Sequence, residues 1–167
     1  MAYAVVRTDD MAGTDVRGQL VSVKYMGADG ATPTEIENGH VLKIGALMEG
    51  EREIYVGADV AANDPIEDVV LIATPELMYD ERKHNLADYI NEAGKALRGY
   101  HIHKGDTFSI TAEAFDGDPA VGMIVELADG NKLKCVESAT SGSTKVGRII
   151  EKQVIGNRFV YWAIKVD

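Results

Sequence analysis

Two of the four histidines of this 167-residue chain lie in the segment YHIHKGDTFSIT, residues 100–111. On a β-strand, His101 and His103 would point to the same face, where their imidazoles could share a metal ion with Asp106. A closed zinc site would need further ligands at a compelling spacing, and none is evident. We therefore predict a strand, a tight Lys-Gly-Asp turn and a second strand, with no bound metal. A metal-dependent enzyme that uses His101, His103 and Asp106 is kept as the alternative.

Other patterns that carry catalysis are missing from the sequence. It has no glycine-rich phosphate loop, no GxSxG elbow and no HExxH motif. The carboxylates at 49–53 and 116–118 surround glycines, which is typical of acidic turns. The single cysteine, Cys135, has no histidine near it in sequence, and we interpret it as a small packed side chain. We predict no enzymatic activity and no cofactor.

The composition restricts the partners. The net charge is −10, and phosphate backbones are bound through clusters of Lys and Arg, so direct binding to nucleic acid or to an anionic membrane surface is disfavoured. No apolar run approaches the roughly 20 residues that span a bilayer. One cysteine excludes an internal disulfide framework. We expect a soluble protein made in the cytoplasm.

The elements that must position these residues are mostly strands. LVSVKY alternates with period two, and the aliphatic run VVLIAT is typical of a strand buried on both faces. Asp-Gly in ADGN and Gly-Asn in IGN indicate two hairpins near the C-terminus. About ten strands at this spacing predict a single β-barrel or β-sandwich-like domain over residues 18–167.

One α-helix is predicted near residues 86–98. Apolar residues at steps of four, three and four would form one stripe, with an N-cap before them and Gly99 after them. The stripe consists of Leu86, Ile90, Ala93 and Leu97. Residues 1–17 show no clean period and are predicted to be an N-terminal arm that could become ordered on a partner.

Four segments together resemble the small head decoration, or cement, proteins of tailed bacteriophages. They are NGHVLKIGALMEGEREIY, DVVLIATPELMYDERKH, YINEAGKALRGYHIHKGDTFSIT and STKVGRIIEKQVIGNRFVYWAIKV. The resemblance covers about residues 18–166. It implies a β-rich virion protein that binds the major capsid protein on the outer surface of the expanded shell, without activity or cofactor. Members of this class often form dimers or trimers. Another virion component, such as a head fibre base or a tail protein, is the alternative.

On this hypothesis the arm and one loop would supply the contacts to the capsid or to a second subunit, because they lack regular pattern and are expected to be exposed. The candidate residues are Tyr3, Val5, Arg7, Met11, Arg17, Glu49, Glu51 and Arg52. Trp162 is interpreted as core packing or as a cross-strand aromatic partner, with a protein interface as the alternative.

Overall fold

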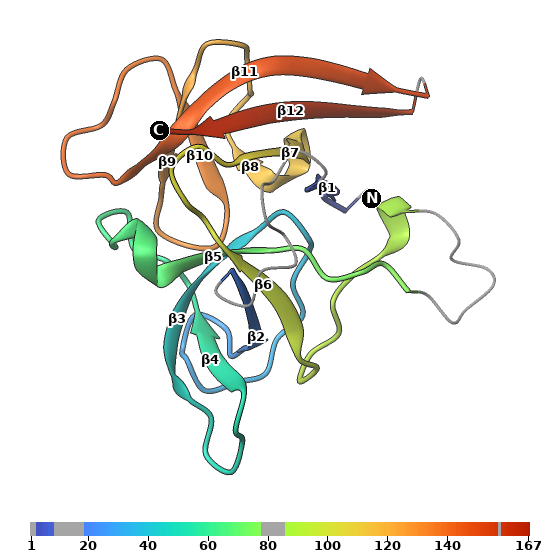
Figure 1. Ribbon diagram of the computed structural model, residues 1–167, viewed down its shortest axis with the longest axis vertical. Helices are drawn as coiled ribbons and strands as arrows, with labels where there is room; N and C mark the ends of the chain where they lie inside the picture. The colour runs from blue at the N-terminus through green and yellow to red at the C-terminus, as the bar shows by residue number, and fades with distance from the viewer. Residues whose placement is uncertain (1–2, 9–18, 78–85, 157) are drawn as a thin grey trace.

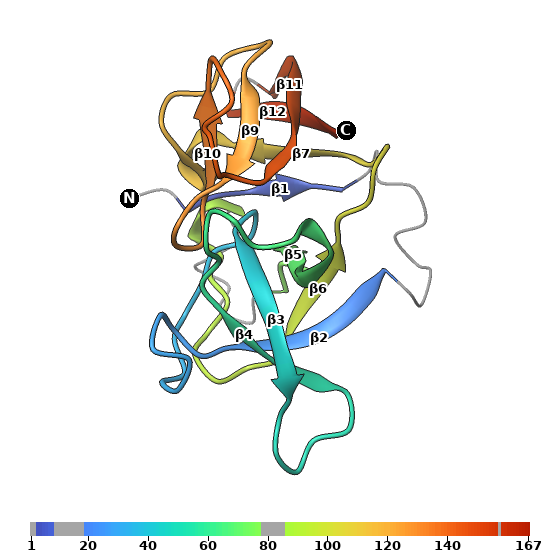
Figure 2. The ribbon, with the colours of Figure 1, turned by 90° about the vertical axis from the view of Figure 1, so that its left-hand side faces the viewer.

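The computed structural model describes residues 3–8, 19–77, 86–156 and 158–167. These residues form a closed five-stranded barrel and a seven-stranded sheet that packs against it, with the barrel in the lower part of Figures 1 and 2. The prediction of a mainly β domain of barrel or sandwich type is confirmed, and the structure contains a barrel.

The barrel has the strand order β2-β4-β3-β5-β6, closed by the pairing of β6 with β2. Only β2 and β4 are parallel, and the other pairs are antiparallel. Its strands are β2 (Leu20–Tyr25), β3 (Val41–Leu47), β4 (Ile54–Ala58), β5 (Val69–Ile72) and β6 (Leu97–His101).

The sheet has the order β1-β7-β12-β11-β9-β10-β8 and is antiparallel except where β10 meets β8. Its strands are β1 (Val6–Arg7), β7 (Thr107–Thr111), β8 (Phe115–Asp116), β9 (Ile124–Leu127), β10 (Leu133–Val136), β11 (Lys145–Ile155) and β12 (Phe159–Val166). Both predicted C-terminal hairpins are present, as β9–β10 and β11–β12.

Strand β5 contributes side chains to two apolar clusters, one inside the barrel and one between the barrel and the sheet. Val70 and Ile72 belong to the apolar cluster inside the barrel, whereas Val69 and Leu71 belong to the larger cluster shared with the sheet. All four residues are buried, because successive side chains of a strand point to opposite faces. The prediction of a strand buried on both faces is confirmed.

The predicted α-helix near 86–98 is wrong: the described residues contain only 3₁₀ turns, at Ile66–Asp68, Leu86–Asp88 and Ala112–Ala114. Asn91 forms an isolated bridge with Ile36, and Gly94 has a φ of 78°, which a right-handed helix does not accept. Leu97 is buried as the first residue of β6, whereas Leu86 is 39% exposed. The apolar spacing therefore does not form a single face.

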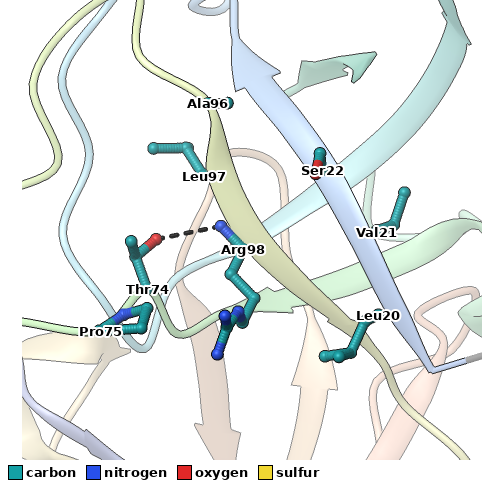
Figure 3. A pocket seen from close by; sticks show the side chains of 8 residues that line it. All are labelled: Leu20, Val21, Ser22, Thr74, Pro75, Ala96, Leu97 and Arg98. Carbon is teal, nitrogen blue, oxygen red and sulfur yellow. Dashed lines mark hydrogen bonds between the residues drawn. The ribbon is translucent and has the colours of Figure 1, made fainter. Parts of the chain in front are cut away.

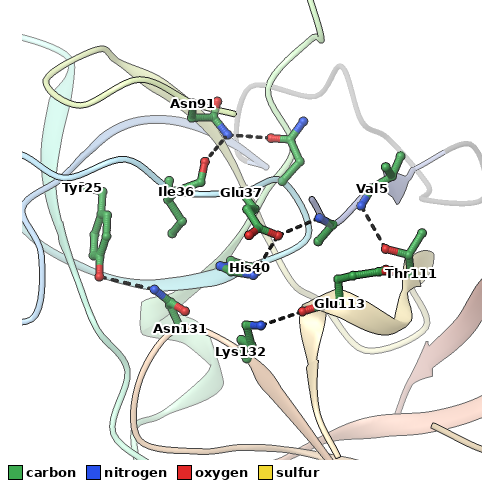
Figure 4. Close-up of polar contacts among 12 residues, drawn as sticks. Val5, Tyr25, Ile36, Glu37, His40, Asn91, Thr111, Glu113, Asn131 and Lys132 are labelled. Carbon is green, nitrogen blue, oxygen red and sulfur yellow. Dashed lines mark hydrogen bonds and ion pairs between the residues drawn. The ribbon is translucent and has the colours of Figure 1, made fainter. Parts of the chain in front are cut away.

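The described part of the predicted arm, residues 3–8, lies against the domain. Val6 and Arg7 form β1, which pairs with β7. The N–H of Val5 donates to Thr111 Oγ1 at 3.1 Å, and the N–H of Ala4 donates to Glu37 Oε2 at 2.6 Å (Figure 4). Ala4 and Val5 are buried, so this part of the chain is an edge of the sheet.

Candidate protein-interaction surface on the C-terminal hairpin

The HIHKGD segment joins β6 to β7, and its turn is built as the sequence predicts. Gly105 has a φ of 98°, and Asp106 Oδ2 accepts a hydrogen bond from the N–H of His103 at 2.9 Å. Gly105 also donates to the carbonyl of Val166 at 3.0 Å, which ties the turn to the end of β12. The role of Asp106 that the structure shows is therefore to cap the turn.

The two histidines of this segment do not complete a metal site. Their ring centroids are 6.4 Å apart, and His103 Nδ1 lies 3.9 Å from Asp106 Oδ2. Partial burial and the nearby His103 lower the pKa of His101. Within the described ranges, no group of three or more His, Cys, Asp or Glu side chains could hold a metal ion.

Cys135 lies in β10 and is buried in the core shared by the sheet and the barrel. Burial, with smaller contributions from Asp116 and Asp118, raises the pKa of its thiol to about 12. A thiol is a nucleophile only as the thiolate, so this cysteine is a packed side chain, as the sequence predicts.

A groove of about 400 Å³ opens between β2, β6 and the segment after β5 (Figure 3). Arg98 and Thr74 lie along it, and Thr74 Oγ1 accepts a hydrogen bond from the backbone N–H of Arg98 at 3.1 Å. The described residues that line it include no carboxylate, imidazole or thiol. This groove therefore offers hydrogen bonds and one positive charge rather than acid–base chemistry.

The β11–β12 hairpin extends beyond the rest of the sheet (Figure 1). Strand β9 pairs with β11 only as far as Arg148, and β7 pairs with β12 only from Tyr161 onward. The end of the hairpin, residues 150–156 and 158–160, is therefore two-stranded. It is the part of the described structure that we define as the hairpin end.

Apolar side chains of the hairpin end face solvent in cross-strand pairs. Val154 lies opposite Val160, and these side chains are 59% and 38% exposed. Ile155 lies opposite Phe159 and is 42% exposed, and Ile150 is 46% exposed. Half of the eight exposed large apolar residues of the described chain lie here. Val154 and Val160 lie on one face of the hairpin and Ile155 and Phe159 on the other, because successive side chains of a strand alternate. Exposed apolar side chains that gather on a face typically mark an interaction site.

Cations lie over the aromatic rings of the same hairpin. Lys152 Nζ is 5.1 Å from the ring centroid of Trp162, and the guanidinium of Arg158 is 5.7 Å from that of Phe159. Arg7 of β1 lies 5.6 Å from the Tyr161 ring and donates to Gln153 Oε1 at 3.2 Å. Aromatic residues and arginine are enriched in protein interfaces and their hot spots.

The hairpin also differs in charge from the rest of the chain. Residues 145–167 contain five basic and two acidic residues, a net charge of +3, whereas residues 1–144 contain twelve basic and twenty-five acidic residues, a net charge of −13. This asymmetry is visible in the sequence and could have indicated the hairpin before its structure was known. Its exposed apolar residues could not, because alternation alone does not tell which strands extend beyond the sheet.

The predicted contact residues fall into two separate places. Tyr3 and Arg7 lie beside the hairpin, and Val5 is buried and hydrogen-bonded to Thr111 of β7. The loop with Glu49, Glu51 and Arg52 joins β3 to β4 at the far end of the barrel (Figure 1). There, Glu51 pairs with Lys24 at 3.5 Å. Met11 and Arg17 lie outside the described residues.

Trp162 is half-buried and packs against the main apolar cluster, as the core interpretation predicts. Comparison of the chain with protein-family models, curated proteins and solved structures finds no match. None of the helical segments that the structure describes has the length and apolar character to cross a membrane.

Proposed function

We propose that this protein is a structural component of a tailed-bacteriophage head, which binds the outer surface of the expanded capsid and stabilises it. The resemblance of the sequence to head decoration proteins supports this proposal. The observation that carries it is the hairpin end, where exposed Val154 and Val160 share a face with Lys152, whose Nζ lies over the Trp162 ring.

The physical basis of such a role is preferential binding. A protein that binds the expanded shell and not its precursor stabilises the expanded shell by mass action. Apolar side chains in the centre of the contact would supply affinity, and the cations at the margin would orient the protein on an acidic surface. The major capsid protein is therefore the proposed partner.

The test is co-sedimentation of the purified protein with expanded, undecorated heads and with unexpanded procapsids. We expect saturable binding to expanded heads alone. The double variant Val154→Asp/Val160→Asp should bind at least about tenfold more weakly, because it places two carboxylates in the centre of the contact.

The matched control is Leu47→Asp, which changes an apolar side chain of 44% exposure at the barrel end of the molecule. It should bind like the wild-type protein. Loss of binding in Leu47→Asp alone would move the contact to the β3–β4 loop. Absence of wild-type binding to either shell would refute the capsid role and favour a tail or fibre location.

A further inference from the structure

One edge of β11 is open. The strand has eleven residues, and β9 covers only its first part, through Arg148. Ile149 still exchanges backbone hydrogen bonds with Met123 and Gly122, at 2.9 and 2.8 Å. From Ile150 to Ile155, no described segment pairs with this edge. An open strand edge is a template for another strand.

The direction of the backbone groups on this edge follows from the pairing. The N–H of Thr111 donates to Val5 on β1, so Thr111 turns its backbone away from β12. Two residues that lie opposite each other in an antiparallel pair direct their backbone N–H and C=O groups either both toward each other or both away. Tyr161 lies opposite Thr111 and therefore directs these groups away from β7, toward β11.

Gln153 lies opposite Tyr161 and therefore directs its backbone groups back toward β12. Its neighbours Lys152 and Val154 direct theirs away from β12. Their two N–H and two C=O groups consequently point out of the open edge, where a strand could bind them.

The side chains of the edge disfavour pairing with a second copy. A two-fold antiparallel pair of β11 strands centred on Lys152 would place Lys152 opposite its own copy. Centring on Glu151 would place two glutamates opposite each other. Like charges directly opposite destabilise a strand pair. Centring on Gln153 would place Lys152 opposite Val154. In none of these registers does Lys152 face a carboxylate.

The same side chains favour a strand that carries a carboxylate. The charged residues of the open stretch are Glu151 and Lys152, and the longer segment 145–167 has a net charge of +3. Lys152 would face the carboxylate, and exposed Val154 would contact an apolar residue two positions along the added strand. Strand addition of this kind combines backbone hydrogen bonds with side-chain specificity.

We propose that an extended segment of the partner, with alternating acidic and apolar residues, adds to the open edge of β11 as an eighth strand of the sheet. This inference rests on the proposed function, which identifies the partner as the major capsid protein of the expanded head. It adds the mode of recognition and the chemistry of the recognised segment.

The experiment compares two pairs of variants in co-sedimentation with expanded heads. Val154→Pro removes an N–H from the open edge and leaves the hydrogen bonds between β11 and β12 in place, whereas Val154→Thr keeps both the N–H and the β-branched shape. We expect about tenfold weaker binding for the proline variant and wild-type binding for the threonine variant.

The second pair tests the charge without touching the backbone. Lys152→Glu reverses a charge on the edge, and Lys104→Glu makes the same change in the exposed turn at the opposite end of β12. Only Lys152→Glu should weaken binding. This pair decides the question if Val154→Pro fails to fold, as judged by its thermal unfolding.

Hydrogen exchange gives a direct readout of the bound edge. The amides of Lys152 and Val154 should exchange more slowly when the wild-type protein is bound to heads. If the wild-type protein binds but exchange is unchanged and Lys152→Glu binds normally, strand addition is refuted while the capsid role stands. If the wild-type protein does not bind heads, both proposals fail. A dimer in solution that Val154→Pro abolishes would assign the edge to a second copy instead.

Discussion

Glu37 fastens the N-terminal strand to the rest of the molecule: its Oε2 atom accepts a hydrogen bond from the backbone N–H of Ala4 at 2.6 Å. The two residues are 33 positions apart, and Ala4 is buried. The same carboxylate oxygen lies 3.8 Å from Nε2 of the buried His40 (Figure 4). The attachment of β1 therefore depends on a small polar cluster beside the core.

Removal of the Glu37 carboxylate should loosen β1. In Glu37→Ala the buried N–H of Ala4 loses its acceptor, which we expect to cost about 1–3 kcal/mol of unfolding free energy. Glu37→Gln keeps an oxygen in place and should cost less. Urea denaturation gives the free energies, and hydrogen exchange of the Ala4 amide reports the loosening directly.

Glu113→Ala is the control, because the contact of Glu113 with Lys132 uses its backbone carbonyl. It should leave both measurements unchanged. Equal stability of Glu37→Ala and the wild-type protein would show that the hydrogen bond to Ala4 does not hold the strand.

Stability should fall in acid because of His40. This side chain is buried, neither ring nitrogen has a hydrogen-bond partner among the described residues, and burial together with nearby Lys132 lowers its pKa to about 4. Between pH 6.5 and 4 the unfolded chain therefore binds a proton that the folded protein does not. The stability is fully present above pH 6.5 and is lost as the pH falls toward 4, by about 3 kcal/mol.

His40→Leu should remove this dependence, since it eliminates the titrating group and fills a similar volume. We expect it to be at least as stable as the wild-type protein at pH 7, and to lose about 3 kcal/mol less between pH 7.5 and 4. Urea denaturation series at several pH values measure the difference. A His40→Leu protein whose stability falls with pH as steeply as that of the wild-type protein would contradict the assignment.

The strands were predictable because burial on one or two faces leaves a direct mark on a strand's sequence. LVSVKY forms β2, the first four residues of VVLIAT form β5, and the Asp-Gly and Gly-Asn signals marked the two C-terminal hairpins. The predicted helix is wrong because its apolar spacing came from two separate elements, the 3₁₀ turn at Leu86–Asp88 and strand β6. Buried Asn91 donates to the Ile36 carbonyl and to Asn38 Oδ1, both at 3.0 Å, and this long-range pairing overrides local propensity.

The candidate site was less predictable than the fold. The His101–His103 pair was a candidate site because histidines are common metal ligands. The hairpin end consists of residues such as Val154 and Lys152, whose types indicate no particular function. Its significance comes from where β9 and β7 stop, which is a tertiary property. Only the positive charge of the last 23 residues could have been noticed in advance.

The barrel interior should not accept a methyl group at Gly57. A Cβ at this position would lie 2.5 Å from Val23 Cγ1 and 3.0 Å from Leu42 Cδ1. Overpacking of this kind should cost Gly57→Ala about 1–3 kcal/mol in unfolding free energy. At Gly45, in the neighbouring strand β3, the closest atom would be the Val56 carbonyl oxygen at 3.2 Å, so Gly45→Ala should cost less.

A double-mutant cycle identifies the clash as the cause. Val23→Ala removes the methyl group that the new Cβ would meet, so Gly57→Ala should be less destabilising in the Val23→Ala background than in the wild-type protein. Additive free energies, measured by urea denaturation of the four proteins, would show that Gly57 is required for another reason. A double variant that is less destabilised than the sum of the two single effects would establish that contact between β2 and β4 sets the size of residue that the barrel accepts.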